Sequence, residues 1–202
     1  HMHGNGQDQI GQIHNAGTTV VHGDVGQCYG YGAKGGKLFI RGNAAGRPMI
    51  NSVGSPKLVI NGTALDYLAE SFMAGDPLNG GGFVIINGIE YDDKGELHAM
   101  ETPYPGGNLF SLSSGGAIYV RDPYGRVSSS QLNGGDFTEL TPADWDILEP
   151  LLVENETHFG IPLAALLTVE GEVRAPEAVY RKIIPIRSKA LSVEADWGGN
   201  HN

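Results

Sequence analysis

The stretch Gly35-Gly36-Lys37-Leu38-Phe39-Ile40-Arg41-Gly42 decides the fold, because close copies of it recur along most of the chain. Four more copies align with it on their small-residue pairs, at residues 16–23, 55–62, 81–88 and 115–122. The copies end 19, 20, 26 and 34 residues apart, which describes a repeat with insertions. Units of this length cannot bury their own apolar faces, so they predict a stacked solenoid of strands.

Within each copy the side chains alternate with the period of a β-strand. The positions four and two before the end, such as Leu38 and Ile40, form the predicted inner face. The position between them is also apolar, which predicts a cover on the outer face, either the C-terminal segment or a partner protein. We take this outer column as the candidate docking surface: Val20, Phe39, Val59, Ile85 and Tyr119.

A polar column follows, one residue before each corner: His22, Arg41, Asn61, Asn87 and Arg121. Glycine is concentrated at the corners, where it permits positive φ, as at Asn61-Gly62 and Asn87-Gly88. The glycines assigned to the structural repeat are Gly23, Gly26, Gly30, Gly35, Gly36, Gly42, Gly62, Gly82, Gly88 and Gly116. An antiparallel sandwich with type I′ hairpins is the alternative, but no matching return strand follows each corner.

The composition limits the possible partners. The 202 residues include 13 Lys and Arg against 23 Asp and Glu, a net charge of −10 that argues against a nucleic-acid or anionic-membrane surface. The single cysteine, Cys28, excludes an internal disulfide framework and cannot alone hold an iron–sulfur cluster or structural zinc. Without a secretory segment or a long apolar run, we expect a cytoplasmic protein.

The chain divides into four predicted parts. Residues 1–15 are expected to be a tag remnant and flexible lead-in or a fragment of an earlier turn, and 16–136 the β-helix repeats with an inserted hairpin and loop at 89–114. Residues 137–190 form a helical C-terminal segment, followed by a frayed tail at 191–202. In that segment, Thr141-Pro142-Ala143-Asp144 signals a helix that stops near Gly160. A hairpin is predicted at 168–173 and another helix at 176–182.

Three features invite a chemical interpretation. Gly30-Tyr31-Gly32-Ala33-Lys34-Gly35 fits the dinucleotide fingerprint, but a predicted strand follows it where that motif needs a helix. Cys28, with His22 nearby in sequence, is a possible nucleophile, although a buried apolar cysteine is the simpler interpretation. The acidic insertion at 90–101 is more typical of a solvated turn than of an acid/base site. We therefore predict no catalytic, cofactor-binding or metal-binding residues in this chain.

The repeats resemble the GXGXG domain at the C-terminus of the glutamate synthase large subunit. The resemblance is carried by residues 23–30, 35–44, 60–68 and 72–75, by Leu140–Asp144 and His158–Gly160, and by Tyr180–Pro185. It implies a right-handed parallel β-helix without catalytic residues. It further implies that partner subunits supply the chemistry: a glutamine amidotransferase that releases ammonia, and a flavoprotein with FMN and an iron–sulfur cluster that makes glutamate from 2-oxoglutarate.

The expected function is thus a non-catalytic scaffold of a glutamate-synthase-like complex. Two alternatives stay open. One is a stand-alone enzyme acting at the 90–101 insertion or at Cys28. The other is a scaffold within a complex like formylmethanofuran dehydrogenase, one of whose chains shares the β-helix. The insertion at 89–114 and the small number of complete turns depart from the glutamate synthase pattern, and leave the reaction of the complex open.

Overall fold

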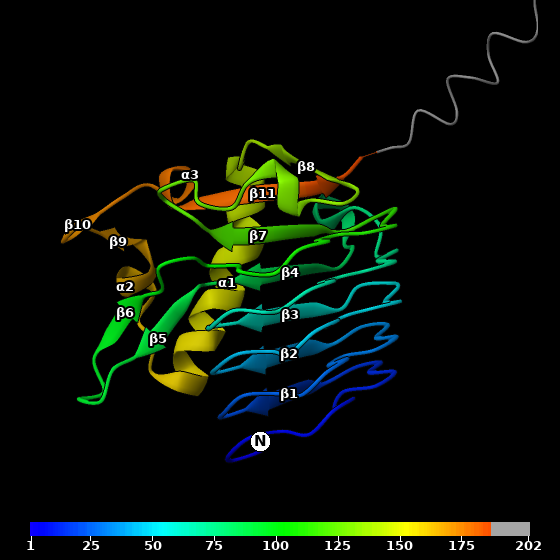
Figure 1. The fold of residues 1–202 in the computed structure, drawn as a ribbon, viewed down its shortest axis with the longest axis horizontal. Coiled ribbons are helices and arrows are strands. Elements are labelled where there is room, and N and C mark those ends of the chain that lie inside the picture. Colours follow the sequence, from blue (N-terminus) through cyan, green and yellow to red (C-terminus); the bar gives the residue numbers. More distant parts are fainter. Residues whose placement is uncertain (187–202) are drawn as a thin grey trace, which may run out of the picture.

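The computed structural model describes residues 1–186 and shows a β-solenoid with a long helix along one side (Figure 1). Each repeat copy contributes one strand: β1 (Thr18–Val21), β2 (Lys37–Ile40), β3 (Lys57–Ile60), β4 (Phe83–Ile86) and β7 (Ala117–Arg121). These strands pair in parallel and in register, so that Ile40 lies between Val21 and Ile60. Three turns join β1 to β4, and a longer turn carries the insertion to β7. The predicted repeat is confirmed as a parallel β-solenoid.

The predicted inner face forms the core of the coil. Leu38, Ile40, Leu58 and Ile60 are fully buried and belong to one apolar cluster that runs through successive turns. Burying a side chain of this size contributes roughly 1.5–3 kcal/mol, so the stack of identical positions is a main source of stability. In-register pairing keeps each aliphatic side chain above its equivalent in the next turn.

The glycines that follow β2 and β3 have a different role from the one predicted. Gly42 and Gly62 do not have positive φ; a Cβ on either would overlap Oδ1 of an Asp or Asn from the preceding turn. That oxygen accepts a backbone N–H one turn on: Asp24 Oδ1 from Asn43 N at 2.7 Å and Asn43 Oδ1 from Thr63 N at 2.9 Å. Each glycine therefore leaves room for a ladder of side-chain caps between turns.

Positive φ occurs at Gly88, as predicted, and also at many residues other than glycine. A left-handed conformation costs about 1–2 kcal/mol for a residue with a Cβ. Backbone hydrogen bonds between turns oppose this cost, as from Arg47 N to the Asp66 carbonyl at 2.8 Å. Four such residues occupy equivalent corner positions with φ between 51° and 62°: Cys28, Arg47, Tyr67 and Asn108.

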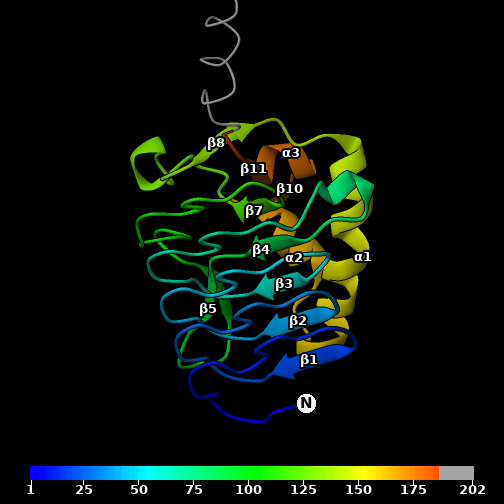
Figure 2. The same ribbon diagram turned by 90° about the vertical axis from the view of Figure 1, so that its right-hand side faces the viewer.

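The helix α1 (Pro142–Phe159) begins and ends where the sequence predicted. Thr141 and Asp144 form a reciprocal capping box, and Gly160 ends the helix with φ 68°. α1 crosses the outer faces of the strands (Figures 1 and 2) and buries them with Leu148, Leu151 and Leu152. Its 18 residues span about 27 Å at about 1.5 Å each, enough to cross five strands spaced about 4.8 Å apart.

The candidate docking column is consequently not a surface. Val20, Phe39, Val59, Ile85 and Tyr119 are all fully buried beneath the chain's own helices. Of the two covers that the sequence left open, the C-terminal segment is the one observed. The prediction of this column as a docking site is wrong, because a strand face this apolar is already covered within the chain.

Two further strands close one end of the coil. β11 (Tyr180–Pro185) pairs antiparallel with β7 on one side and with β8 (Gly135–Thr138) on the other. The helix predicted at 176–182 is shorter, because α3 (Pro176–Val179) ends where Tyr180 enters the pairing with Arg121. The other short elements are η1 (Pro77–Asn79), η2 (Ser129–Gln131), α2 (Leu163–Leu167), β9 (Thr168–Val169) and β10 (Glu172–Val173), the last two forming the predicted hairpin.

Residues 2–14 form the fragment of an earlier turn that the sequence left as one possibility. Their backbone donates to the first complete turn, for example from Gly6 N to the Asp24 carbonyl at 2.7 Å and from Ile13 N to the Tyr31 carbonyl at 2.8 Å. The predicted frayed tail at 191–202 lies outside the described residues, as does the end of the 137–190 segment.

The insertion is shorter than its predicted boundaries of 89–114. Within residues 89–114, the part that projects from the coil is the hairpin of β5 (Ile89–Tyr91) and β6 (Leu97–Ala99) (Figure 1). Leu109 and Phe110 are fully buried in the coil interior, and Phe110 N donates to the Leu68 carbonyl at 3.0 Å. The second half of the predicted insertion is therefore a corner of the solenoid whose sequence differs from the other corners.

Candidate functional site: the groove beside the inserted hairpin

Buried asparagines join the polar column to α1. Asn61 and Asn155 exchange two side-chain hydrogen bonds of 2.9 Å each, and Asn87 Nδ2 also donates to Asn61 Oδ1 at 2.9 Å. The Tyr180 hydroxyl donates to Asn87 Oδ1 at 2.8 Å. All three asparagines are fully buried. Since these groups bond to one another, the network fixes the position of α1 and presents nothing to a ligand.

A buried ion pair holds the other end of α1. Asp144 Oδ1 accepts from Lys182 Nζ and from the Tyr119 hydroxyl, both at 2.6 Å, while its Oδ2 accepts from the backbone N of Thr141 at 2.9 Å. Burial alone would raise the pKa of Asp144, but the hydrogen bonds from Lys182, Tyr119 and Thr141 outweigh it and hold that pKa below its ordinary value. The carboxylate therefore stays charged and joins α1 to β7 and β11.

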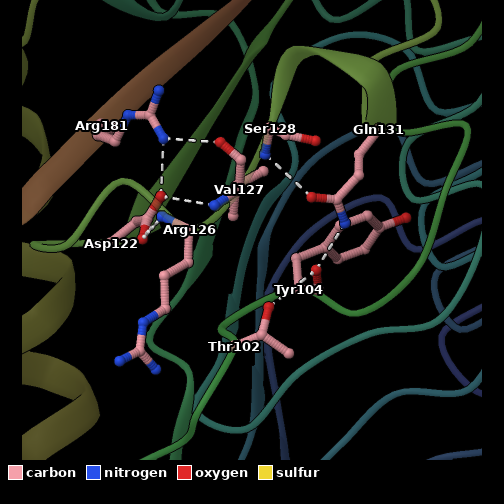
Figure 3. Close-up of polar contacts among 8 residues, drawn as sticks. All are labelled: Thr102, Tyr104, Asp122, Arg126, Val127, Ser128, Gln131 and Arg181. Carbon is pink, nitrogen blue, oxygen red and sulfur yellow. Dashed lines mark hydrogen bonds and ion pairs between the residues drawn. The ribbon is translucent and has the colours of Figure 1, made fainter.

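A third polar network lies near β11 and the loops around it (Figure 3). Asp122 Oδ2 accepts from Arg181 Nη1 at 2.7 Å and from Val127 N at 3.0 Å. Gln131 donates from Nε2 to the Tyr104 carbonyl at 2.8 Å. These contacts tie the loop that returns from the insertion to the loop that leaves β7. In each of these contacts the side chain bonds either to a backbone group or to the oppositely charged side chain of an ion pair.

The sequence motifs that suggested chemistry have structural explanations. The fingerprint loop at 30–35 leads into the strand β2, at the place where the dinucleotide motif needs a helix. Cys28 shares its left-handed conformation with Arg47, Tyr67 and Asn108, so its backbone strain belongs to the corner and not to a reactive thiol. Within residues 1–186 no hydrogen bond joins Cys28 to His22; the His22 ring instead stacks on His3 with centroids 4.4 Å apart.

The insertion brings three potential ligand groups together at its exposed tip. Asp92, Glu96 and His98 each offer one atom within 4.8 Å of the others, and His98 Nε2 lies 3.1 Å from Asp92 Oδ2. Asp92 Oδ1 also accepts the backbone N–H groups of Glu96 and Lys94 at 2.8 and 2.9 Å. The Glu96 N–H is the main reason that the pKa of Asp92 is lowered. The carboxylate thus has a role in the hairpin turn itself.

A groove of about 470 Å³ lies between this hairpin and the segment α2–β9–β10. Its apolar lining comes from Ile89, Leu97 and Ala99 on the hairpin and from Ala165 on α2, whereas the polar groups are Arg121, His98, Thr168 and Glu170. Arg121 is only 6% exposed. Its Nε donates to the Leu166 carbonyl at 2.7 Å and its Nη2 to the Thr168 carbonyl at 2.9 Å.

Arg121 differs from the other buried cation in how its charge is balanced. Lys182 faces Asp144, but among residues 1–186 no carboxylate lies within ion-pair distance of Arg121. Burial lowers the pKa of Arg121, with Tyr180 and Tyr124 acting in the opposite direction. The groove is therefore a half-open cavity with a single uncompensated cation in its lining.

Sequence reasoning identified the polar column but not what its members contact. The buried role of Asn155 was not predicted, although it lies three and four residues after Leu152 and Leu151 and thus on the buried face of α1. A polar residue on such a face signals a buried partner. No signal in the sequence brings α2 and β9 to Arg121, since the short elements that form that wall are positioned by tertiary packing.

The comparisons add no assignment. No protein-family model matches the chain, and no curated protein matches its sequence. In the part of the chain that the structure describes, no helix has both the length and the apolar character needed to cross a membrane. The fold is a β-solenoid braced by its own helix. The resemblance to the glutamate synthase domain rests on the sequence alone, at the residues quoted above.

Proposed function

We propose that this chain is a non-catalytic scaffold subunit of a glutamate-synthase-like complex. The observation that carries the proposal is a continuous coil, braced along its length by α1, from which the inserted hairpin β5–β6 projects (Figure 1). A solenoid whose two faces are both filled with side chains is suited to holding other domains at a fixed separation. In this proposal the coil is right-handed, as the resemblance implies.

The partners in this proposal are a flavoprotein subunit with FMN and an iron–sulfur cluster, and a glutamine amidotransferase subunit. The docking surface is the hairpin β5–β6, because the apolar outer column is buried and the hairpin presents exposed polar side chains outside the coil. Asp92, Glu96 and His98 lie at its exposed end and offer charged contacts to such a partner.

Reconstitution from purified chains tests the proposal. The chain is mixed with purified flavoprotein and amidotransferase subunits of the glutamate synthase type, and the complex is followed by size-exclusion chromatography and by glutamine-dependent formation of glutamate. We expect one complex, whose activity requires this chain. Turnover or bound flavin in the isolated chain, or full activity of the partners without it, would contradict the scaffold function.

A hairpin deletion separates docking from folding. Replacing residues 90–98 by a short Gly-Ser turn leaves β4 and β7 paired, so the melting transition should be retained while the complex is lost. As a matched control, Arg47→Gln with Glu70→Gln changes an exposed ion pair on a corner of the coil, and assembly should be unaffected.

A further inference from the structure

The groove beside Arg121 has the properties of a binding site for one negative charge. The guanidinium is buried and held in place by the carbonyls of Leu166 and Thr168, so it is fixed before any ligand arrives. These two bonds involve Nε and Nη2, whereas a guanidinium has five N–H donors. No bond from Nη1 is observed within residues 1–186.

The electrostatics of the groove favour occupation by an anion. A buried charge without a partner is costly, and pairing with an opposite charge removes much of that cost. Neither acid near Arg121 does this. Glu170 lies in the groove lining, where its Oε1 is 3.3 Å from the Tyr124 hydroxyl, and Asp122 is paired with Arg181.

We propose that this groove binds the carboxylate group of an aliphatic acid, with the carboxylate on Arg121 and the aliphatic part against Ile89, Leu97 and Ala165. The planar guanidinium matches a carboxylate in geometry. A monoanion fits better than a phosphate, because a single cation serves the groove and Glu170 would repel a second negative charge. A cavity of about 470 Å³ is large enough for a small molecule or a side chain.

The first experiment titrates the full chain with sodium butyrate and, as a neutral isostere, with butyramide. The Arg121 Nε–H resonance is followed by ¹⁵N NMR and the heat of binding by calorimetry. We expect saturable binding of butyrate with a Kd of roughly millimolar, and no shift of that resonance with butyramide. Equal responses to both compounds, or no response of Arg121 to butyrate, would overturn the proposal.

Three variants locate the binding. Arg121→Gln should weaken butyrate binding by at least about tenfold, the value of one charge-assisted hydrogen bond. Ala165→Leu should also weaken it, because it fills the groove while Arg121 stays in place; this variant still tests the site if Arg121→Gln does not fold. Arg174→Gln removes an exposed charge on the same segment, outside the groove lining, and should leave the Kd unchanged. If the Kd rises as much for Arg174→Gln as for Arg121→Gln, the binding depends on the net charge of the segment and not on the Arg121 site.

A second comparison identifies the source of the carboxylate. Acetyl-Gly-Gly-Leu with a free C-terminus is compared with its C-terminal amide, and both with butyrate. Tighter binding of the free peptide than of butyrate assigns the groove to the end of a partner chain, and the reverse order assigns it to a small metabolite. The amide binding as tightly as the free acid would count against a carboxylate site. The proposal does not depend on the scaffold function, since every measurement uses the isolated chain.

Discussion

Two members of the same repeat column meet different surroundings, and the contrast shows how the fold uses its outer face. Asn61 precedes its corner just as Arg121 does, and both side chains bond to elements outside the coil. Asn61 lies beneath α1, and its side-chain amide bonds to Asn155 of that helix and to Asn87 of the next turn. Arg121 lies beyond that helix, facing α2 and a groove, and two carbonyls are its observed partners. One position in the repeat is thus structural in one turn and available for binding in another.

The largest effect should come from truncating the covered face. Phe39→Ala removes a fully buried ring between β2 and α1 and should lower the free energy of unfolding by about 3–5 kcal/mol. Urea denaturation followed by circular dichroism measures the change. Val173→Ala, at an exposed apolar side chain, is the control. A cost below about 1 kcal/mol at Phe39 would contradict the conclusion that packing of this column against α1 is a main source of stability.

A smaller loss should follow removal of one polar anchor. Asn61→Leu leaves the Asn155 and Asn87 amides without their buried partner and should cost about 1–3 kcal/mol. The double variant Asn61→Leu/Asn155→Leu removes both sides of the pair that exchanges two hydrogen bonds. Its cost should be clearly less than the sum of the two single variants. Additive costs in the same urea assay would show that the two amides do not interact.

Acidification should weaken the covered face through Asp144. The pKa of this carboxyl is lowered in the folded chain, so its contribution is present above the unfolded value of about 3.9 and is lost as pH falls through the folded pKa. The urea midpoint should therefore fall steeply below about pH 4. In Asp144→Asn/Lys182→Met, which removes both charges, this part of the slope should be absent. An unchanged slope would assign the acid sensitivity to other carboxyls.

The smallest effect is expected at Arg121, where the comparison began. Arg121→Met removes two hydrogen bonds to carbonyls but also removes a buried charge without a partner, so stability should change by at most about 1 kcal/mol. Lys182→Met is the matched contrast. It leaves Asp144 buried without its ion-pair partner and should lower the free energy of unfolding by about 3–5 kcal/mol. Equal costs for the two variants would place Arg121 among the structural anchors.

The strands, the hairpin at 168–173 and the ends of α1 could be predicted because each depends on local signals. The register of Leu38 with Leu58 follows from the repeat, and the capping box of Thr141 and Asp144 lies within four residues. The role of the glycines after β2 and β3 was predicted incorrectly, since the Asp24 and Asn43 caps act between turns. The groove was not predictable, because it forms only where α2 and β9 pack against the hairpin and the end of β7.

The path of α1 has a consequence for how the molecule unfolds. Phe159 meets His22, Glu154 binds Lys37 at 2.6 Å, Asn155 binds Asn61, and Asp144 binds Tyr119, so one helix contacts four different turns. Repeat arrays stabilised only by neighbouring units can lose their turns one at a time from an end. Here four turns are also held by contacts to one shared helix. Amide hydrogen exchange in β1, β2 and β3 should therefore proceed at a common rate under mild denaturant, as in a single cooperative unit.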